Sequence, residues 1–137
     1  MITVVDGKGS LYETCIESEN IQSCRLNIIS VDNEFGHQNY YIHIGITPPK
    51  SHDRVEWFVE KAVEIGVQEI SFILTDHSER KSIKLKRIEK RAVSSMKQSL
   101  KAFLPKINDI VPLKNLIKIC SNDEKYIGKA RARPQKT

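Results

Sequence analysis

One stretch of the sequence, residues 40–74, limits the possible folds more than any other part of the chain. It begins with the run YYIHIGI at 40–46, in which apolar residues recur at a spacing of two, as they do in a strand. Two prolines at 48–49 then end this pattern, because proline has no N–H group to donate to a neighbouring strand. After a helical segment, residues 67–74 form a second apolar run. The block therefore predicts a strand, a helix and a strand.

The predicted helix of this block has recognisable ends. Asp53 and Glu56 have the spacing of a capping box, in which each side chain bonds a free N–H group at the helix start. Gly66 stands where a left-handed residue closes many helices. The apolar residues that recur at helical spacing between these ends are Val55, Phe58, Val59, Ala62 and Val63. A compact unit of this kind is a right-handed crossover between two parallel strands.

Parallel sheets bind their ligands at the carboxyl ends of the strands. These ends fall at residues 47–54 and 75–80, so we expect a binding site there. The candidate site residues in or beside these segments are Lys50, Arg54, Ser78, Arg80 and Lys81. Ordinary surface charge remains the alternative interpretation of these cations.

Residues 1–36 have the pattern of a small antiparallel sheet. Three apolar segments, at 2–5, 11–16 and 24–31, are each long enough for a strand. The first two flank the sequence DGKG at 6–9, which predicts a hairpin because glycine tolerates the positive φ of tight turns. The sequence NEFG predicts a turn at the end of the segment. Three strands are barely sufficient for an independent sheet, so we expect further strands to complete it.

Charge is spread unevenly along the 137 residues, whose formal net charge is +5. Residues 1–46 contain two basic and six acidic side chains, whereas residues 47–137 contain twenty basic and eleven acidic ones. Because the sign changes where the strand pattern changes, a domain boundary is predicted near residues 36–40. No apolar run approaches the roughly 20 residues of a membrane-spanning helix, and no secretory signal is evident, so a cytoplasmic location without membrane contact is predicted.

A second helix is predicted at residues 85–103. Its apolar residues fall on one face: Leu85, Ile88, Ala92, Met96, Leu100 and Phe103. Its basic residues fall on the other: Lys86, Arg87, Lys90, Arg91, Lys97 and Lys101. From Arg80 to Lys106 there are ten basic residues and a single acid, Glu89. Solvated helix faces usually mix both signs, so the pattern favours phosphate contacts with a polyanion, with a plain solvated face as the alternative.

The remaining segments carry weaker signals. Pro105 ends the helical region, and residues 107–119 predict a short strand and a helical turn. The segment 121–137 is polar and basic without an apolar period, and it predicts a disordered tail. Cys15, Cys24 and Cys120 lack C-x-x-C spacing, which favours reduced thiols over a disulfide or a metal site.

Four stretches of the sequence together resemble a known family. They are TPPKSHDRVEWFVEKAVEIGVQEI at 47–70, SERK at 78–81, AVSSMKQSLKAFLP at 92–105 and VVDGKG at 4–9. They are similar to the family that methylates N3 of a uridine in 16S ribosomal RNA, within the SPOUT superfamily of knotted methyltransferases. The resemblance extends from Val4 to about Leu116.

The resemblance implies an α/β fold in two parts. Residues 1–36 are expected to form part of an antiparallel PUA-like RNA-binding β-barrel, and residues 37–120 the first half of a SPOUT-type parallel α/β domain. The family binds S-adenosylmethionine through a knotted G-P-E-G-G segment and a leucine/arginine/threonine motif, and neither occurs in this sequence. The chain is therefore expected to be a copy shortened at both ends, with no cofactor-binding residue of its own.

The resemblance also implies partners and further site residues. It implies 16S ribosomal RNA or the small ribosomal subunit as partner, and a homodimer. It makes the strand-end residues named above candidate RNA-binding residues: Lys50, Arg54, Ser78, Arg80 and Lys81. Gln98 and Ser99 match the family's Q-S pair and either line the active site or pack the helix. His43 is interpreted as a structural residue, and no constellation makes His52 or His77 catalytic.

Two functions remain open at this point. The chain represents either an S-adenosylmethionine-dependent ribosomal RNA methyltransferase without its donor-binding half, and so inactive alone, or a non-catalytic RNA-binding remnant. A folded fragment with no function of its own is a third possibility. No catalytic residue is assigned.

Overall fold

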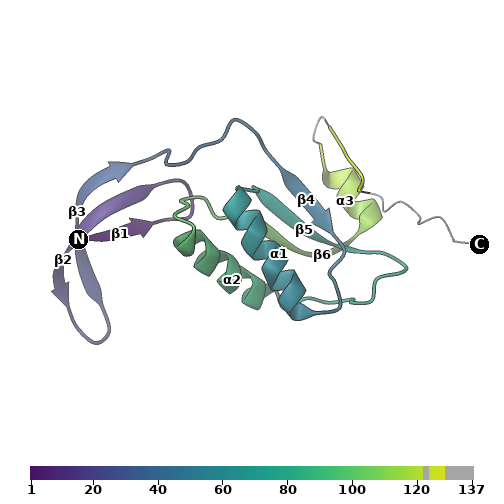
Figure 1. Cartoon of the computed structure of the whole chain (residues 1–137), viewed down its shortest axis with the longest axis horizontal. Coiled ribbons are helices and arrows are strands. Elements are labelled where there is room, and N and C mark those ends of the chain that lie inside the picture. Colours follow the sequence, from purple (N-terminus) through teal and green to yellow (C-terminus); the bar gives the residue numbers. More distant parts are fainter. Residues whose placement is uncertain (122–123, 129–137) are drawn as a thin grey trace, which may run out of the picture.

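The computed structural model describes residues 1–121 and 124–128 (Figure 1). It contains two three-stranded sheets, ordered β1-β2-β3 and β4-β5-β6. Figure 1 shows the first sheet as an arm that extends from the second sheet and its helices. The elements are β1 (Ile2–Val5), β2 (Leu11–Glu19), β3 (Cys24–Asp32), β4 (His43–Ile46), α1 (His52–Ile65), β5 (Glu69–Leu74), α2 (Leu85–Gln98), β6 (Lys106–Pro112) and α3 (Leu113–Ile119). The predicted α/β class, with an antiparallel sheet followed by a parallel β-α sheet, is confirmed.

The first sheet is antiparallel throughout, as its alternating pattern predicts. Its first hairpin closes because the Asp6 carboxylate accepts hydrogen bonds from the N–H groups of Lys8 and Ser10, at 2.8 and 3.0 Å. Gly7 and Gly9 both have a positive φ, which this turn requires. The second and third strands are longer than predicted, because Asn20 organises a tight turn between them through its side chain.

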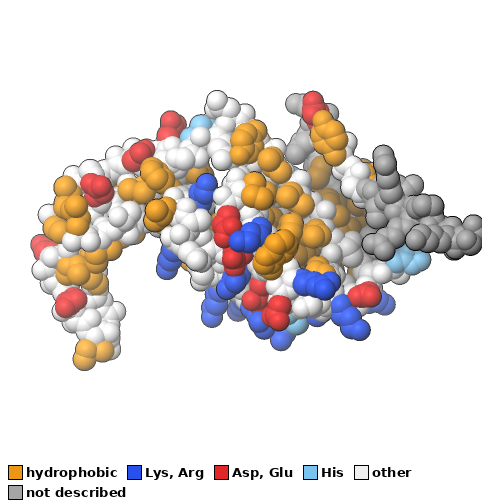
Figure 2. Space-filling view, viewed as in Figure 1, with side chains coloured by type: hydrophobic (Ala, Val, Ile, Leu, Met, Phe, Trp, Pro, Cys, Tyr) orange, Lys and Arg blue, Asp and Glu red, His pale blue; other side chains and the backbone are white. Residues whose placement is uncertain are grey.

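One face of this antiparallel sheet is apolar and largely open to solvent. From the strand register, the apolar residues that share this face are Ile2, Val4, Tyr12, Ile16, Leu26, Ile28 and Val31. Ile16 and Ile28 are 47% and 54% exposed. Figure 2 shows hydrophobic side chains spread over the arm that carries this sheet.

The second sheet is parallel, with β5 between β4 and β6, which confirms the predicted direction of the two strands in the 40–74 block. Both strands begin later than predicted, at His43 and Glu69. The reason lies at Ile42, whose N–H donates to the Gln68 side chain at 2.6 Å instead of joining a ladder. The Ile42 carbonyl accepts the N–H groups of Gln68 and Glu69 instead.

α1 begins one residue before the predicted capping box, and that box does not form. The residue before the helix is Ser51, whose side chain makes no capping hydrogen bond. Glu56 instead binds Arg87 of α2, so tertiary contact takes the side chain that the local pattern assigned to a cap. The predicted helix end is confirmed: Gly66 is left-handed, and its N–H donates to the carbonyls of Ala62 and Val63.

α2 ends at Gln98, five residues earlier than predicted. Leu100 has a φ of +53°, and the Lys101 N–H donates to the Met96 carbonyl, which closes the helix. Leu100 and Phe103 therefore leave the buried face of the helix and are 75% and 40% exposed.

After α2 the chain is held by the first hairpin of the antiparallel sheet. Gly9 donates its N–H to the Ala102 carbonyl, and Leu104 donates its N–H to the Gly7 carbonyl, at 3.0 and 2.8 Å. These contacts tie the two sheets together and direct the chain into β6.

The core lies between the parallel sheet and the helices α1 and α2, which cover one of its faces. Its most buried residues are Val55, Val59, Ala62, Val63, Ile70, Phe72, Ile88, Ala92 and Met96. Their spacing in the helices is the period that the sequence predicts. Because the buried faces of the helices pack on the sheet, this core fixes where β4 and β5 end and which side of α2 faces solvent.

α3 contacts the opposite face of the parallel sheet. A Cβ at Gly45 would meet Leu116 of α3 and Ile73 of β5, so glycine lets this helix approach β4 closely. β6 and α3 confirm the predicted strand and helical turn at 107–119. Of the predicted tail, residues 122–123 and 129–137 lie outside the described residues. Within the described ranges no helix is long and apolar enough to cross a membrane.

Candidate functional site

One arginine links the two segments that follow β4 and β5 at the carboxyl ends of the strands. Arg80, in the segment after β5, places Nη1 2.8 Å from Nε2 of His52 in the first turn of α1. Its Nη2 donates to the main-chain carbonyl of Lys50. Nε of Arg80 is buried and has no hydrogen-bond partner in the described part of the chain. The two segments that the sequence predicts to meet at this edge, 47–54 and 75–80, are in contact.

The environment of His52 favours its neutral form. Burial lowers the pKa of His52, and the positive charges of Arg80, Lys84 and Arg87 lower it further, while Glu56 opposes them. A neutral imidazole can accept the guanidinium hydrogen bond, whereas a protonated one has no free lone pair. The sequence placed His52 near this edge but did not identify its contact with Arg80, because only the folded chain brings the two loops together.

The other predicted residues at this edge differ in their surroundings. Ser78 is buried, and its Oγ accepts the N–H of Thr75 at 2.7 Å, so it structures the turn after β5. Arg54 and Lys81 are exposed and form no ion pair within residues 1–121 and 124–128. Lys50 is exposed as well, and its carbonyl rather than its ammonium group holds Arg80.

The basic face of α2 divides into two parts. Arg87 and Arg91 form ion pairs with Glu56 and Glu60 of α1. They therefore link the two helices, and α1 neutralises their charge.

The lysines of α2 behave differently. Lys86, Lys90 and Lys97 are exposed and have no ion pair with any described residue. Lys101 follows the helix and is half-buried. Figure 2 shows Lys and Arg side chains gathered along the lower edge of the molecule, on the side where α2 lies. We call these four lysines the lysine stripe.

Gln98 and Ser99 lie at the end of α2 that is distant from Arg80. A helix of 14 residues is about 21 Å long, and Arg80 precedes its first turn. Ser99 Oγ donates to the carbonyl of Ser95 at 2.7 Å, so it satisfies the helix terminus. Gln98 is exposed. A role of this pair in lining an active site stays a prediction.

The face of the parallel sheet under α3 carries a polar network. His43 Nε2 lies 2.8 Å from Ser71 Oγ, and the Glu69 carboxylate accepts hydrogen bonds from Tyr41 and Asn108 at 2.5 and 2.6 Å. The bond to Glu69 raises the pKa of Tyr41 to about 12. Burial alone would raise the pKa of Glu69, but these hydrogen bonds, together with the charges of His43 and Lys106, outweigh it and the pKa falls below its usual value. His43 lies between Ser71 and the Glu69 carboxylate, and these partners are typical of a structural histidine.

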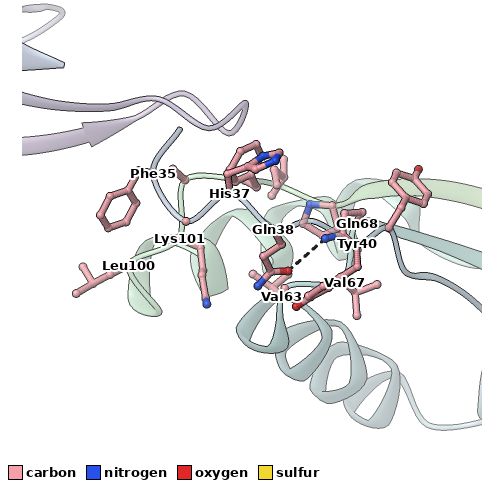
Figure 3. A pocket seen from close by; sticks show the side chains of 16 residues that line it. Phe35, His37, Gln38, Tyr40, Val63, Val67, Gln68, Leu100 and Lys101 are labelled. Carbon is pink, nitrogen blue, oxygen red and sulfur yellow. Dashed lines mark hydrogen bonds between the residues drawn. The ribbon is translucent and has the colours of Figure 1, made fainter. Parts of the chain in front are cut away.

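Two hollows stand out in the described part of the chain. The more enclosed one, of about 510 Å³, opens at the amino ends of the parallel strands, opposite the edge with Arg80 (Figure 3). The other is a shallow depression on the outer side of α2, between Lys86 and Ser94. No group of three or more His, Cys, Asp or Glu residues among the described positions is arranged to hold a metal ion.

Comparisons with known proteins agree with this architecture. Residues 37–136 match the family described as RNA methyltransferase domain. The ribosomal RNA small subunit methyltransferase E of Buchnera aphidicola subsp. Acyrthosiphon pisum (strain APS) is 32% identical over 103 residues, which cover 71% of this chain and 39% of that protein.

Solved structures give the same result. A probable rRNA-methyltransferase from Porphyromonas gingivalis is 40% identical, with a TM-score of 0.79 over 85% of this chain and 49% of that one. The ribosomal RNA small subunit methyltransferase E from Neisseria gonorrhoeae, bound to S-adenosyl methionine, is 22% identical, with a TM-score of 0.77 over 87% and 50%. At that identity the second likeness shows the fold alone.

The chain spans about half the length of these solved structures, and less of the Buchnera protein. The family match nevertheless covers well over half of this chain, and the Buchnera relative is similar over more than two thirds of it. The family match includes the parallel α/β unit, and both matches agree with the resemblance noted in the sequence. This chain belongs to the RNA methyltransferase domain family.

Proposed function

We propose that this chain binds ribosomal RNA, with the lysine stripe on the phosphates and the Arg80 edge facing a uridine. The observation that carries the proposal is the contrast within α2. Arg87 and Arg91 form ion pairs with acids of α1, whereas Lys86, Lys90 and Lys97 form no ion pair with a described residue, and Glu89 is the single acid beside them. An exposed row of cations without ion-pair partners is the electrostatic footprint of a phosphate-binding surface.

The geometry of the stripe suits a polyanion better than a single small anion. Lys86 and Lys90 are one helical turn apart, and Lys97 lies two turns further along the same side. At 1.5 Å per residue, the row from Lys86 to Lys97 is about 16 Å long, which exceeds any single phosphate group. Such a row contacts the backbone without reading bases, so it positions RNA rather than selecting its sequence.

The Arg80 edge supplies the chemistry that a uridine site requires. Methylation of uracil at N3 removes a proton, and nearby positive charge stabilises the resulting anion. Arg80 is held in place by His52 and by the Lys50 carbonyl, and its buried Nε still lacks a partner among the described residues. We propose Arg80 and Arg54 as the cations that face the base.

The residues at this edge do not fit S-adenosylmethionine. The donor carries a positive sulfonium, and the side chains that meet here are a guanidinium and an imidazole. Neither the segment 47–54 nor the segment 75–84 contains a glycine that would let a ligand approach the backbone. We derive no methyl-transfer step for this chain, and the alternative remains a non-catalytic RNA-binding protein.

Isothermal titration calorimetry tests whether the chain binds S-adenosylmethionine. It should show no saturable binding at micromolar donor, and a saturable isotherm would contradict the poor fit of this edge to the donor.

Fluorescence anisotropy with a labelled 16S ribosomal RNA fragment tests the RNA proposal. Affinity should fall with salt, with a log–log slope of roughly −0.7 for each phosphate contact on single-stranded RNA. The double variant Lys90→Glu/Lys97→Glu should bind every RNA more weakly and with a shallower slope. Lys114→Glu/Lys118→Glu on α3 changes the net charge equally and is the matched control. Equal binding by both double variants and the wild type would refute the proposal.

A second comparison addresses the uridine. Two hairpins that differ only by uridine or cytidine in the loop present the same phosphates. Arg80→Ala and Arg54→Ala should reduce the preference for the uridine hairpin while leaving the salt slope nearly unchanged. A drop in affinity that is equal for both hairpins would assign these arginines to the phosphates instead.

A further inference from the structure

The enclosed hollow lies where the antiparallel sheet, the linker after it and the end of α2 meet. Residues 67–68 and 104–105, which directly precede β5 and β6, line it together with residues 40–41, which end two residues before β4. Its volume of about 510 Å³ is within the usual range for small-molecule sites. Val67 and Ala102 are buried beneath it, at 5% and 1% exposure. The hollow is thus a formed feature of the fold, separate from the Arg80 edge.

Aromatic side chains line this hollow and remain accessible. Tyr40 is 48% exposed and Phe103 is 40% exposed, and both contribute to the lining with Phe35. The ring of Phe103 is set by the ring of His37, with the two centroids 6.4 Å apart. Accessible aromatic faces beside a concave surface are the feature on which single-stranded nucleic acids stack their bases.

Two amide side chains fix a hydrogen-bonding group in the hollow. The Gln68 amide is oriented because its oxygen accepts the N–H of Ile42 at 2.6 Å. Nε2 of Gln68 donates to the side-chain oxygen of Gln38 at 3.3 Å, so the side-chain nitrogen of Gln38 points away from Gln68. The Gln38 nitrogen lies close to Gly66, where a Cβ would be 2.9 Å from it, so glycine leaves room for the Gln38 amide. Among the described residues the Gln38 amino group has no acceptor, so it offers a fixed donor to the carbonyl edge of a base.

The rim of the hollow contains the one non-glycine residue with a positive φ in the described chain. Leu100 has a φ of +53° where the Lys101 N–H bonds the Met96 carbonyl and closes α2, and the residue is 75% exposed, so packing does not hold its side chain. Strained residues of this kind concentrate at binding sites. Its neighbour Lys101 lines the hollow, and Lys97 lies one turn earlier, so the lysine stripe leads into it. In Figure 3, Phe35 and Lys101 lie to the left of Gln38.

From these features we infer that the hollow binds an unstacked nucleobase of single-stranded RNA. The base stacks on Tyr40, since the Phe103 ring already lies against Gly9, the Gln38 amide nitrogen donates to its carbonyl edge, and Lys101 contacts the adjoining phosphate. The inference rests on the RNA binding proposed above and adds a base-binding site at the opposite edge of the sheet. Contacts to phosphate alone do not require bases, so the two proposals are separable by experiment.

Two labelled oligonucleotides separate base binding from phosphate binding. One is an oligouridylate, and the other has the same length and the same number of phosphates but abasic sugars. The wild type should prefer the oligouridylate, by roughly 5- to 150-fold for one stacked base. Tyr40→Ala should abolish most of that preference while Tyr40→Phe, which keeps the ring, retains it. Trp57→Ala removes an aromatic residue that is 61% exposed on α1 and serves as the matched control.

The outcomes are distinct. Equal affinity of the wild type for both oligonucleotides would overturn the base site and leave the phosphate proposal intact. Loss of the preference in Trp57→Ala as well as Tyr40→Ala would also overturn it, because the effect would then not belong to the hollow. If neither oligonucleotide binds in a salt-dependent manner, the proposed function itself fails. Circular dichroism of each variant confirms that the comparison is between folded chains.

Discussion

Arg80 donates a hydrogen bond to Nε2 of His52 across 2.8 Å, and this bond ties the loop after β5 to the first turn of α1. The bond requires an unprotonated ring nitrogen. Its presence therefore makes the contact between the two loops sensitive to pH in the range where histidine titrates.

The first prediction concerns that pH dependence. Burial and the charges of Arg80, Lys84 and Arg87 lower the pKa of His52 in the folded state, against Glu56. The unfolded chain takes up the proton near pH 6.5, before the folded chain does. The free energy of unfolding should therefore be unaffected by His52 above about pH 6.5 and should fall as the pH drops below it. Urea unfolding at several pH values measures this decrease.

The matched variant for this prediction is His52→Gln, whose amide accepts a hydrogen bond and does not titrate. Its free energy of unfolding should fall less between neutral and mildly acidic pH than that of the wild type. Parallel pH curves for the two proteins would show that His52 does not contribute.

The second prediction concerns the ion pairs between α1 and α2. Arg87–Glu56 and Arg91–Glu60 are partly exposed, since the arginine side chains are 52% and 44% accessible. Double-mutant cycles on each pair should therefore give a coupling of about 0.2–1 kcal/mol that decreases with salt. A cycle between Lys90 and Glu56 is the control and should show no coupling. Salt screens exposed ion pairs, so a coupling energy that stays the same at high salt would contradict this prediction.

The third prediction compares two glycines with a positive φ. Gly66→Ala places a Cβ 2.9 Å from the Gln38 amide in addition to forcing a left-handed backbone. Gly36→Ala has the same backbone problem, but no atom lies within 4 Å of its Cβ. We expect Gly36→Ala to destabilise the fold by about 1 kcal/mol, the cost of the backbone alone. Gly66→Ala should destabilise it slightly more, because the Gln38 amide must move away and loses its hydrogen bond with Gln68. Thermal unfolding of the two variants measures the difference, and equal losses would mean that moving the Gln38 amide has no cost.

The fourth prediction concerns Leu100. Glycine at this position relieves the left-handed strain, while its greater freedom in the unfolded chain offsets part of the gain. Leu100→Gly should therefore stabilise the chain by up to about 1 kcal/mol. Chemical unfolding checks the sign of the change. A loss of stability would mean that the exposed Leu100 side chain makes a favourable contact in the folded state.

The fifth prediction concerns the open face of the antiparallel sheet. Ile16, Ile28 and Val31 are about half exposed on one side of it, and exposed apolar surfaces of this kind promote association. The chain should show weak, concentration-dependent self-association in sedimentation velocity. Ile28→Lys should reduce it, whereas Asn27→Lys on the opposite face should not. A monomer at all concentrations would count against the prediction.

The parallel unit was predictable from the sequence because its signals are local. Period-two and helical spacing reflect how a strand or helix presents one face to a core, and Gly66 marks a backbone conformation that few other residues adopt. The strand starts were wrong by two or three residues. At Ile42 a side chain, that of Gln68, replaces a main-chain partner, and no local pattern reports such a substitution.

The end of α2 shows a second limit. The sequence contains no helix breaker between Gln98 and Pro105, so its period predicts a helix that continues to Phe103. The folded chain stops it earlier, because Gly7 and Gly9 of a distant hairpin bond the residues that follow. The hollow and the strained Leu100 are consequences of this contact, and for that reason sequence reasoning did not find them.

For the basic residues, too, the sequence determined one part and the tertiary structure the other. The sequence by itself determined that residues 80–106 are strongly basic and that the basic residues of α2 share one face, because composition and spacing are properties of the chain alone. Only the tertiary structure decided which of these charges remain available. The packing of α1 beside α2 gives Arg87 and Arg91 acidic partners and leaves the lysines facing solvent, since an ion pair depends on distances that exist only in the folded molecule.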